Sequence, residues 1–243
     1  MQFENQTVII TGGSSGIGLA AAQAFAHAGA RVVNMDIAPP KIALVEANIL
    51  YYQTDVADKI ALEKQVEKVL QQFGSLDVLV NSAGVSGEPT GTDQLLEADF
   101  DRVMGVNVKG TLFAMQAVLP HFKERRRGSI VNVASMAGHV VMPGYLAYVA
   151  SKHAVLGITK VTALEFAKYN IRVNAVCPAF TSTPMISDME ANTPFRDALL
   201  QAFPMKRFAT AEEIAAGILF LASDAASFMT GTGMIMDGGL SLQ

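Results

Sequence analysis

Three residues between positions 135 and 152 have the types and spacing needed for acid–base chemistry: Ser135, Tyr148 and Lys152. A lysine four residues after a tyrosine lies on the same face of a helix. Free tyrosine titrates near ~10, so bringing its pKa to about 7 takes roughly 4 kcal/mol of preferential stabilisation of the phenolate, which a nearby cation can supply. The pair is therefore a candidate general acid/base, although an amphipathic helix with a surface lysine would have the same spacing.

The elements predicted around these residues bring them to one site. A strand over residues 130–133 ends just before Ser135, and the helix that contains the tyrosine and the lysine continues to about residue 169. An earlier helix, over about 99–122, contains Asn107 and a glycine three residues later, and both types disfavour the middle of a helix. Such violations are expected where function overrides propensity, so Asn107 is a further candidate.

The segment TGGSSGIG at residues 11–18 has the context of a dinucleotide-binding turn. It follows a β-branched strand (7–10), opens a helix (17–27) and precedes a second strand (31–35), which predicts a βαβ unit of a parallel sheet. In this order of glycines, the first permits a sharp turn, the second lets the backbone approach a pyrophosphate, and the third lets helix and strand pack closely. The N-terminus of the helix then offers free N–H groups to the anion. The three glycines are Gly12, Gly16 and Gly18.

Asp36 ends the second strand, twenty residues after Gly16. A carboxylate at this position accepts hydrogen bonds from the ribose hydroxyls of NAD and repels the 2′-phosphate of NADP. The glycine turn holds no basic residue, and the next one after Asp36 is Lys41. We therefore expect NAD rather than NADP. A turn-forming aspartate would explain neither the spacing nor the neighbouring motif.

Alternating strands and helices continue to residue 236. Asp55 follows a strand over 50–53 and is either an adenine contact or the N-cap of a helix from about Ala57, or both. Residues 38–50 leave room only for a stunted second helix. Further strands are predicted over 76–80, 173–176 and 233–236, the first of them closed by small residues that allow close approach to a cofactor. The pattern predicts one doubly wound α/β domain over residues 1–243, with a seven-stranded, mostly parallel sheet flanked by helices. Residues 1–135 would bind the cofactor, and residues 135–243 would carry the catalytic and substrate-binding groups.

Composition and charge limit the classes of function. Apolar residues make up 51% of the 243 residues and charged residues 16%, which is typical of a folded globular protein. The net charge of -4, without a basic stripe, argues against a nucleic-acid partner. Arg125, Arg126 and Arg127 before Gly128 are interpreted as a basic helix end with a glycine cap.

The cysteine and histidine content also limits the chemistry. A single cysteine, Cys177, excludes an internal disulfide and favours a reducing cytoplasm. The four histidines show no metal-ligand spacing, so no metal site is expected. Neither a signal peptide nor a membrane span is expected, because the start lacks the charged and apolar segments of a signal peptide and no apolar run reaches ~18 residues.

Over essentially its whole length, the chain resembles the short-chain dehydrogenase/reductase family. The matching motifs are TGGSSGIG (11–18), Asp55, NSAG (81–84), Asn107, Ser135, YVASK (148–152), PAFTSTP (178–184) and DGG (237–239). The resemblance implies a Rossmann-type fold, a nicotinamide cofactor, hydride transfer between an alcohol and a carbonyl, and a homotetramer.

The resemblance also implies roles for individual residues. Tyr148 would exchange a proton with the substrate oxygen, and Lys152 would lower the pKa of Tyr148 and bind the nicotinamide ribose. Ser135 would polarise the substrate oxygen, and Asn107 would position a relay water. The backbone of Thr181 and the side chain of Thr183 would hold the carboxamide. The full set of expected cofactor contacts is Gly12, Ser14, Ser15, Gly16, Ile17, Gly18, Asp36, Asp55, Val56, Asn81, Ala83, Gly84, Tyr148, Lys152, Pro178, Thr181 and Thr183.

Three positions depart from the usual family pattern: Ser82 replaces an asparagine, Ala179 replaces a glycine, and Thr181 stands where valine or isoleucine is commoner. None of these changes removes a catalytic group. Ala179 could narrow the pocket beside the nicotinamide and so affect the choice of substrate.

The substrate is expected to be a small secondary alcohol or ketone. The pocket walls should be mostly apolar, with one polar corner, and the candidates are His139, Met142, Tyr145, Met185 and Met189. His139 could equally be a loop histidine bonded to backbone. One alternative within the family is a 3-oxoacyl-carrier-protein reductase that uses NADPH. The alternative from another class is a non-catalytic dinucleotide-binding regulatory module, of a kind that commonly lacks the tyrosine or the lysine.

Overall fold

The computed structural model describes residues 2–40 and 48–242, with the side chains of residues 188, 189 and 195 excepted. Within these ranges, one sheet of seven strands forms in the order β3-β2-β1-β4-β5-β6-β7, and every neighbouring pair is parallel. The strands are β1 (Thr7–Thr11), β2 (Arg31–Asp36), β3 (Ile49–Gln53), β4 (Val78–Asn81), β5 (Gly128–Val133), β6 (Ile171–Pro178) and β7 (Gly233–Met236). The predicted doubly wound domain is confirmed, and its sheet is wholly parallel.

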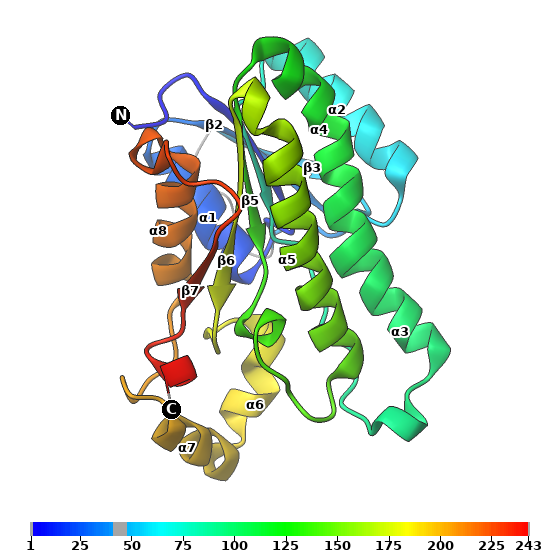
Figure 1. Cartoon of the computed structure of the whole chain (residues 1–243), viewed down its shortest axis with the longest axis vertical. Coiled ribbons are helices and arrows are strands. Elements are labelled where there is room, and N and C mark those ends of the chain that lie inside the picture. Colours follow the sequence, from blue (N-terminus) through cyan, green and yellow to red (C-terminus); the bar gives the residue numbers. More distant parts are fainter. Residues whose placement is uncertain (1, 41–47, 243) are drawn as a thin grey trace.

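Helices cover both faces of the sheet (Figure 1). The helices are α1 (Gly16–His27), α2 (Lys59–Phe73), α3 (Glu97–Met104), α4 (Thr111–Arg125), α5 (Leu146–Phe166), α6 (Ser187–Ala191), α7 (Thr193–Ala202) and α8 (Ala211–Ala222). One core lies between the sheet and the helices α1 and α8, and a second lies under α2, α4 and α5. Alternate side chains of β1 supply both cores, because successive strand residues point to opposite faces: Val8 and Ile10 pack in the first and Ile9 in the second.

The strand order places a ligand site where the direction of winding reverses. Strands β1 and β4 are neighbours in space, although two strands separate them in the sequence. In such sheets, ligands bind outside the carboxyl ends of the strands at this point. The helices α6 and α7 lie beyond those strand ends in Figure 1 and cover the same side of the molecule.

Several predicted element boundaries were wrong. The helix predicted over 99–122 is interrupted by a π-helical turn, Gly105–Gly110, that contains Asn107. The N-cap of α2 is Asp58, whose carboxylate accepts from the amide of Ala61, so Asp55 does not cap that helix. At the end of α4 the left-handed cap is Arg126, with φ 51°, and not Gly128. Gly128 begins β5, where a β-carbon would overlap the ring of Phe122.

Other expectations concern the crossovers. The expected stunted helix after β2 falls on residues 41–47, which lie outside the described residues. Between residues 184 and 204, where the sequence predicts no helix or strand, the structure forms α6 and α7. No helix of the described residues is long and apolar enough to cross a membrane.

Candidate active site

A cleft of about 790 Å³ lies at the carboxyl ends of the central strands. Its wall is formed by the glycine turn after β1, the end of β2, and the loops after β4, β5 and β6. The cleft therefore collects residues from both halves of the chain. Four motifs were expected to bind the cofactor or to react, and each contributes to the lining: the glycine turn, NSAG, Ser135 with YVASK, and PAFTSTP.

The glycine turn has the geometry that the sequence predicts. Gly12 has φ 70°, and a β-carbon there would lie 2.6 Å from the backbone of Ala83. A β-carbon at Gly18 would overlap the carbonyl oxygen of Gly12, so only glycine lets α1 pack against the turn. Gly16 has φ 51° and faces the side chain of Thr183 across the cleft. The N-cap residue Ser15 makes no side-chain capping bond, which leaves the first N–H groups of α1 available to an anion.

Asp36 lines the cleft and also holds the glycine turn in place. Its carboxylate accepts hydrogen bonds from the amide of Ser14 at 3.0 Å and from the amide of Ala38 at 3.3 Å. The hydroxyl of Ser14 donates to the carbonyl of Ala38 and accepts from the side chain of Asn34. Ser14 is thus tied to the end of β2 and is not among the residues that line the cleft.

Ser135, Tyr148 and Lys152 come together on one side of the cleft. Ser135 lies two residues after β5, where its hydroxyl accepts from the amide of Ala137, and Tyr148 and Lys152 lie one turn apart on α5. The ammonium of Lys152 donates to the carbonyl of Val133 at 2.9 Å and lies 5.5 Å from the centre of the Tyr148 ring. The predicted acid–base pair therefore lies beside the serine.

Burial dominates the electrostatics of this group. It raises the pKa of Tyr148 above its ordinary value, and a hydrogen bond with Ser135 offsets part of the change. Burial also lowers the pKa of Lys152 to about 8, although proximity to Cys177 works against that change. The pKa of Tyr148 is therefore raised, whereas the resemblance implies that Lys152 lowers it, and burial is the largest cause of the difference.

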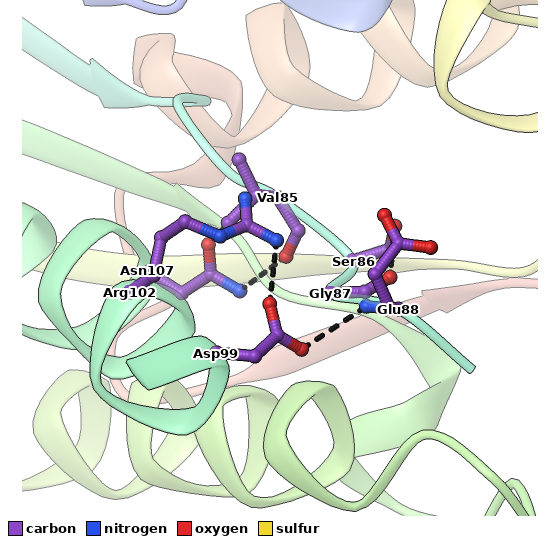
Figure 2. Close-up of polar contacts among 7 residues, drawn as sticks. All are labelled: Val85, Ser86, Gly87, Glu88, Asp99, Arg102 and Asn107. Carbon is purple, nitrogen blue, oxygen red and sulfur yellow. Dashed lines mark hydrogen bonds and ion pairs between the residues drawn. The ribbon is translucent and has the colours of Figure 1, made fainter. Parts of the chain in front are cut away.

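Asn107 is fully buried beneath the cleft and holds the loop after β4 (Figure 2). Its side chain accepts from the amide of Val85 and donates to the carbonyl of Val85, both at 2.9 Å. The second amide hydrogen goes to the hydroxyl of Ser151. Both side-chain N–H groups are thus used within the protein, so a relay water can be held only by the carbonyl oxygens of Asn107.

The remaining expected cofactor contacts fall into two groups: residues that lie beneath the cleft and support its wall, and residues that line it. Asn81 lies under the cleft, where its amide donates to Asn132 on β5, and Gly18 packs inside the glycine turn. Asp55 accepts from the amide of Ala57 and also faces the cleft. The expected residues that line the cleft are Gly12, Ser15, Gly16, Ile17, Asp36, Asp55, Val56, Ala83, Gly84, Tyr148, Lys152, Pro178, Thr181 and Thr183.

Three of the substrate candidates, Met142, Tyr145 and Met185, line the cleft. His139 does not: it is exposed, and its Nε2 lies on the side of β7, where a β-carbon at Gly233 would be 3.5 Å away. The side chain of Met189 lies outside the described part of the chain. Ser82 and Ala179, two of the departures from the family pattern, both lie in the wall.

Val140, Val141 and Ile186 extend the apolar wall. Other lining residues were not predicted: Leu240 and Ser241 reach the cleft from the last described turn of the chain. Arg102 on α3 also lines the cleft. Its spacing from Asn107 gave no signal, because residues five apart do not share a helix face.

Comparison with known proteins agrees with the geometry. A family model described as Enoyl-(Acyl carrier protein) reductase matches residues 12–241. The 3-oxoacyl-[acyl-carrier-protein] reductase FabG of Thermotoga maritima is 41% identical, with 99% of each chain covered. The chain belongs to the short-chain dehydrogenase/reductase family. Within this short-chain dehydrogenase/reductase family it is also 38% identical to the 2-(R)-hydroxypropyl-CoM dehydrogenase of Xanthobacter autotrophicus, with 96% of this chain and 98% of the relative covered.

A solved structure of another family member extends the likeness to three dimensions. ElxO with NADP bound superimposes with a TM-score of 0.92 at 34% identity, with 98% of this chain and 99% of that chain covered. As a short-chain dehydrogenase/reductase, the protein is an oxidoreductase that acts on alcohol or ketone groups.

Proposed function

We propose that the protein is an NAD-dependent dehydrogenase or ketoreductase that acts on a small, uncharged secondary alcohol or ketone. The observation that carries the proposal is the meeting of Ser135, Tyr148 and Lys152 on one wall of a cleft whose other end holds Asp36. When bound, the nicotinamide cofactor supplies or accepts the hydride. The glycine turn and the uncapped start of α1 fit a pyrophosphate, because they offer backbone N–H groups without side chains in the way.

The chain's own residues would handle the proton and the oxygen. The Tyr148 hydroxyl donates its proton to the carbonyl oxygen during reduction and takes one back during oxidation. The Ser135 hydroxyl donates a hydrogen bond to the same oxygen and stabilises the charge that develops there. With a pKa of about 8, Lys152 titrates close to neutral pH and is suited to pass a proton on to Tyr148.

The preference for NAD rests on charge. Asp36 and Asp55 line the cleft, and among its described lining residues only Arg102 and Lys152 are basic. A 2′-phosphate beside Asp36 would meet a carboxylate. The solved structure of ElxO contains NADP, so the preference of the present protein has to be measured.

The substrate proposal rests on the apolar wall. Met142, Met185 and Ile186 line the cleft, together with Tyr145 and Ser86, which carry hydroxyl groups. Apolar walls with a few polar groups suit a small molecule without a charge. His139 is left out of the proposed substrate site because it lies outside the cleft.

One alternative has specific support. The identity of 41% with a 3-oxoacyl-[acyl-carrier-protein] reductase favours a carrier-bound substrate, and the similar structure of ElxO with NADP bound favours NADPH. Steady-state rates with NADH and NADPH, on a panel of free ketones and on acetoacetyl-coenzyme A as a thioester probe, distinguish the two proposals. A strong preference for NADPH and the thioester would replace the first proposal with the second.

The test of the function itself is Tyr148→Phe. We expect turnover, followed by NADH absorbance on the ketone panel and on the corresponding alcohols with NAD, to fall by at least about a hundredfold, because a positioned acid contributes about 10²–10⁴ in rate. The affinity for NADH, followed by fluorescence, should change little. Turnover close to that of the wild type would contradict the assigned role. A wild type that binds NADH and turns over no substrate would favour a regulatory module.

The proposal also includes the assembly and the location of the enzyme. We propose a homotetramer in a reducing cytoplasm, supported by the single buried cysteine and by two separate exposed apolar surfaces. Residues 1–135 would hold most of the cofactor, and residues 135–243 would supply the acid–base group and most of the substrate wall.

A further inference from the structure

The loop after β4 forms part of the cleft wall without being helix or strand. Val85 and Ser86 line the cleft, and Glu88 and Thr90 follow directly. A segment of this kind keeps its shape only if other elements hold its backbone. Asn107 holds one point, at Val85.

Asp99 holds a second point of this loop (Figure 2). It lies in the first turn of α3, and its carboxylate accepts from the amide of Glu88 at 3.1 Å through Oδ2. Its other oxygen, Oδ1, accepts from the guanidinium of Arg102 at 2.7 Å. These bonds lower the pKa of Asp99, with the bond from Arg102 as the largest cause.

Gly87 is shaped for this contact. It has φ 74°, which disfavours any side chain, and a β-carbon there would lie 2.9 Å from Oδ2 of Asp99 and 3.0 Å from Val103. The missing side chain lets α3 approach the loop closely. Two independent features, a carboxylate on the helix and a glycine on the loop, therefore serve the same junction.

The loop after β4 is also hydrogen-bonded to a second part of the cleft wall. The amide of Thr90 donates to the carbonyl of Gly144 at 2.9 Å. Gly144 precedes Tyr145, which lines the cleft and lies three residues before Tyr148. Burial raises the pKa of Tyr145, and the negative charge of Glu88 adds to the rise.

We propose that Asp99 is a positioning residue that holds the substrate-facing wall formed by residues 85–90 and 142–145. The proposal rests on the proposed function, because it assigns this wall to the alcohol or ketone. Asp99 does not line the cleft. It reaches the wall through the amide of Glu88 and through the guanidinium of Arg102, which does line the cleft. Its loss should therefore alter substrate binding while the cofactor site and the acid–base group stay in place.

The test compares Asp99→Ala with Asp101→Ala, which removes the same charge from an exposed position on the same helix. For the most reactive ketone of the panel, we expect Asp99→Ala to raise KM by about tenfold, the effect of one lost hydrogen bond to a charged group. The kcat and the affinity for NADH should change little. Asp99→Asn retains an acceptor oxygen for Glu88 and should restore most of the affinity, and Asp101→Ala should behave as wild type.

Two further measurements keep the test decisive. In Gly87→Ala, the added β-carbon would crowd Asp99 and Val103 from the loop side, so this variant should also raise KM. It provides a second test if the Asp99→Ala protein does not fold. Amide hydrogen exchange at Glu88, Thr90 and Tyr145 should become faster in Asp99→Ala and not in Asp101→Ala.

Failure of this proposal differs from failure of the proposed function. An unchanged KM in Asp99→Ala, or an equal loss of NADH affinity, overturns the positioning role while wild-type turnover stands. If the wild type turns over no substrate, the enzyme proposal fails. In that case, amide hydrogen exchange in Asp99→Ala still tests whether Asp99 holds the two loops. An unchanged exchange rate at Tyr145 refutes the positioning role.

Discussion

The burial of Lys152 carries an energetic cost. The residue is 6% exposed, and its ammonium donates to the carbonyl of Val133. Burial of an ammonium disfavours its charged form, which is why the pKa falls to about 8. Cys177 nearby is affected by the same burial, which raises the pKa of its thiol to about 11, so that it stays neutral where Lys152 titrates.

The lowered pKa of Lys152 predicts a pH-dependent stability. Between about 8 and the ordinary 10.5 the unfolded chain binds more protons than the folded one, so the free energy of unfolding rises with pH. The penalty is present in full below this range and disappears above it. Relative to Lys152→Met, the wild type should gain about 1 kcal/mol between pH 7.5 and 9, measured by urea unfolding. The free energy of unfolding of Lys64→Met, a change at an exposed lysine, should depend on pH in the same way as that of the wild type. A pH-independent difference between wild type and Lys152→Met would contradict a buried, titrating ammonium.

Among elements, the glycine turn and α1 act as one unit. Gly12 and Gly18 meet where the helix begins, and Asp36 and Asn34 hold the turn from β2 through Ser14. The turn therefore keeps its shape through its neighbours as well as through its own glycines. A substitution at the meeting point should disturb the pyrophosphate site before it disturbs the rest of the sheet.

Gly18→Ala tests this unit. Alanine favours an exposed helix interior by about 1 kcal/mol over glycine, but here the β-carbon would overlap the carbonyl oxygen of Gly12, and overpacking of this kind costs about 1–3 kcal/mol. We expect a lower melting temperature and weaker NADH binding, measured by thermal unfolding and fluorescence titration. Gly91→Ala is the control, because its nearest group is the flexible carboxylate of Asp93. An alanine at 18 that stabilises the protein would show that α1 can shift.

At the scale of the whole molecule, two sets of exposed apolar side chains are candidates for the proposed contacts between subunits. Val161 and Leu164 on α5 are 58% and 83% exposed, and they lie on one face of the helix. Phe228 and Ile235 are exposed around β7, one of the two edge strands of the sheet. Edge strands and apolar faces of this kind are normally covered, and two different twofold contacts build a tetramer.

Leu164→Asp should weaken one of these contacts. A carboxylate buried between two subunits lacks a partner and carries a desolvation cost. We expect a smaller assembly than the wild type in size-exclusion chromatography with light scattering, while circular dichroism stays unchanged. The neighbouring Glu165→Ala should keep the wild-type mass. If Leu164→Asp also keeps it, the α5 surface is not an interface between subunits.

Local pattern was enough for the strands, the glycine turn and the acid–base group. The parallel strands follow from apolar runs, and Gly12, Tyr148 and Lys152 lie where their spacing predicts. Element ends were less predictable: Asp58 rather than Asp55 caps α2, because either aspartate can accept an amide and the local sequence does not select one. The π-helical turn at Asn107 was signalled only as a violation of helix propensity.

The amino-acid sequence by itself determined the wound α/β sheet, the βαβ turn and the one-turn spacing of Tyr148 and Lys152, because these follow from local apolar patterns and from residue spacing. Only the tertiary structure decided which side chains share the cleft. It excluded His139, brought in Arg102 and joined α3 to the loop after β4 through Asp99. It also set the pKa directions of Tyr148 and Lys152, because burial depends on residues far away in the chain.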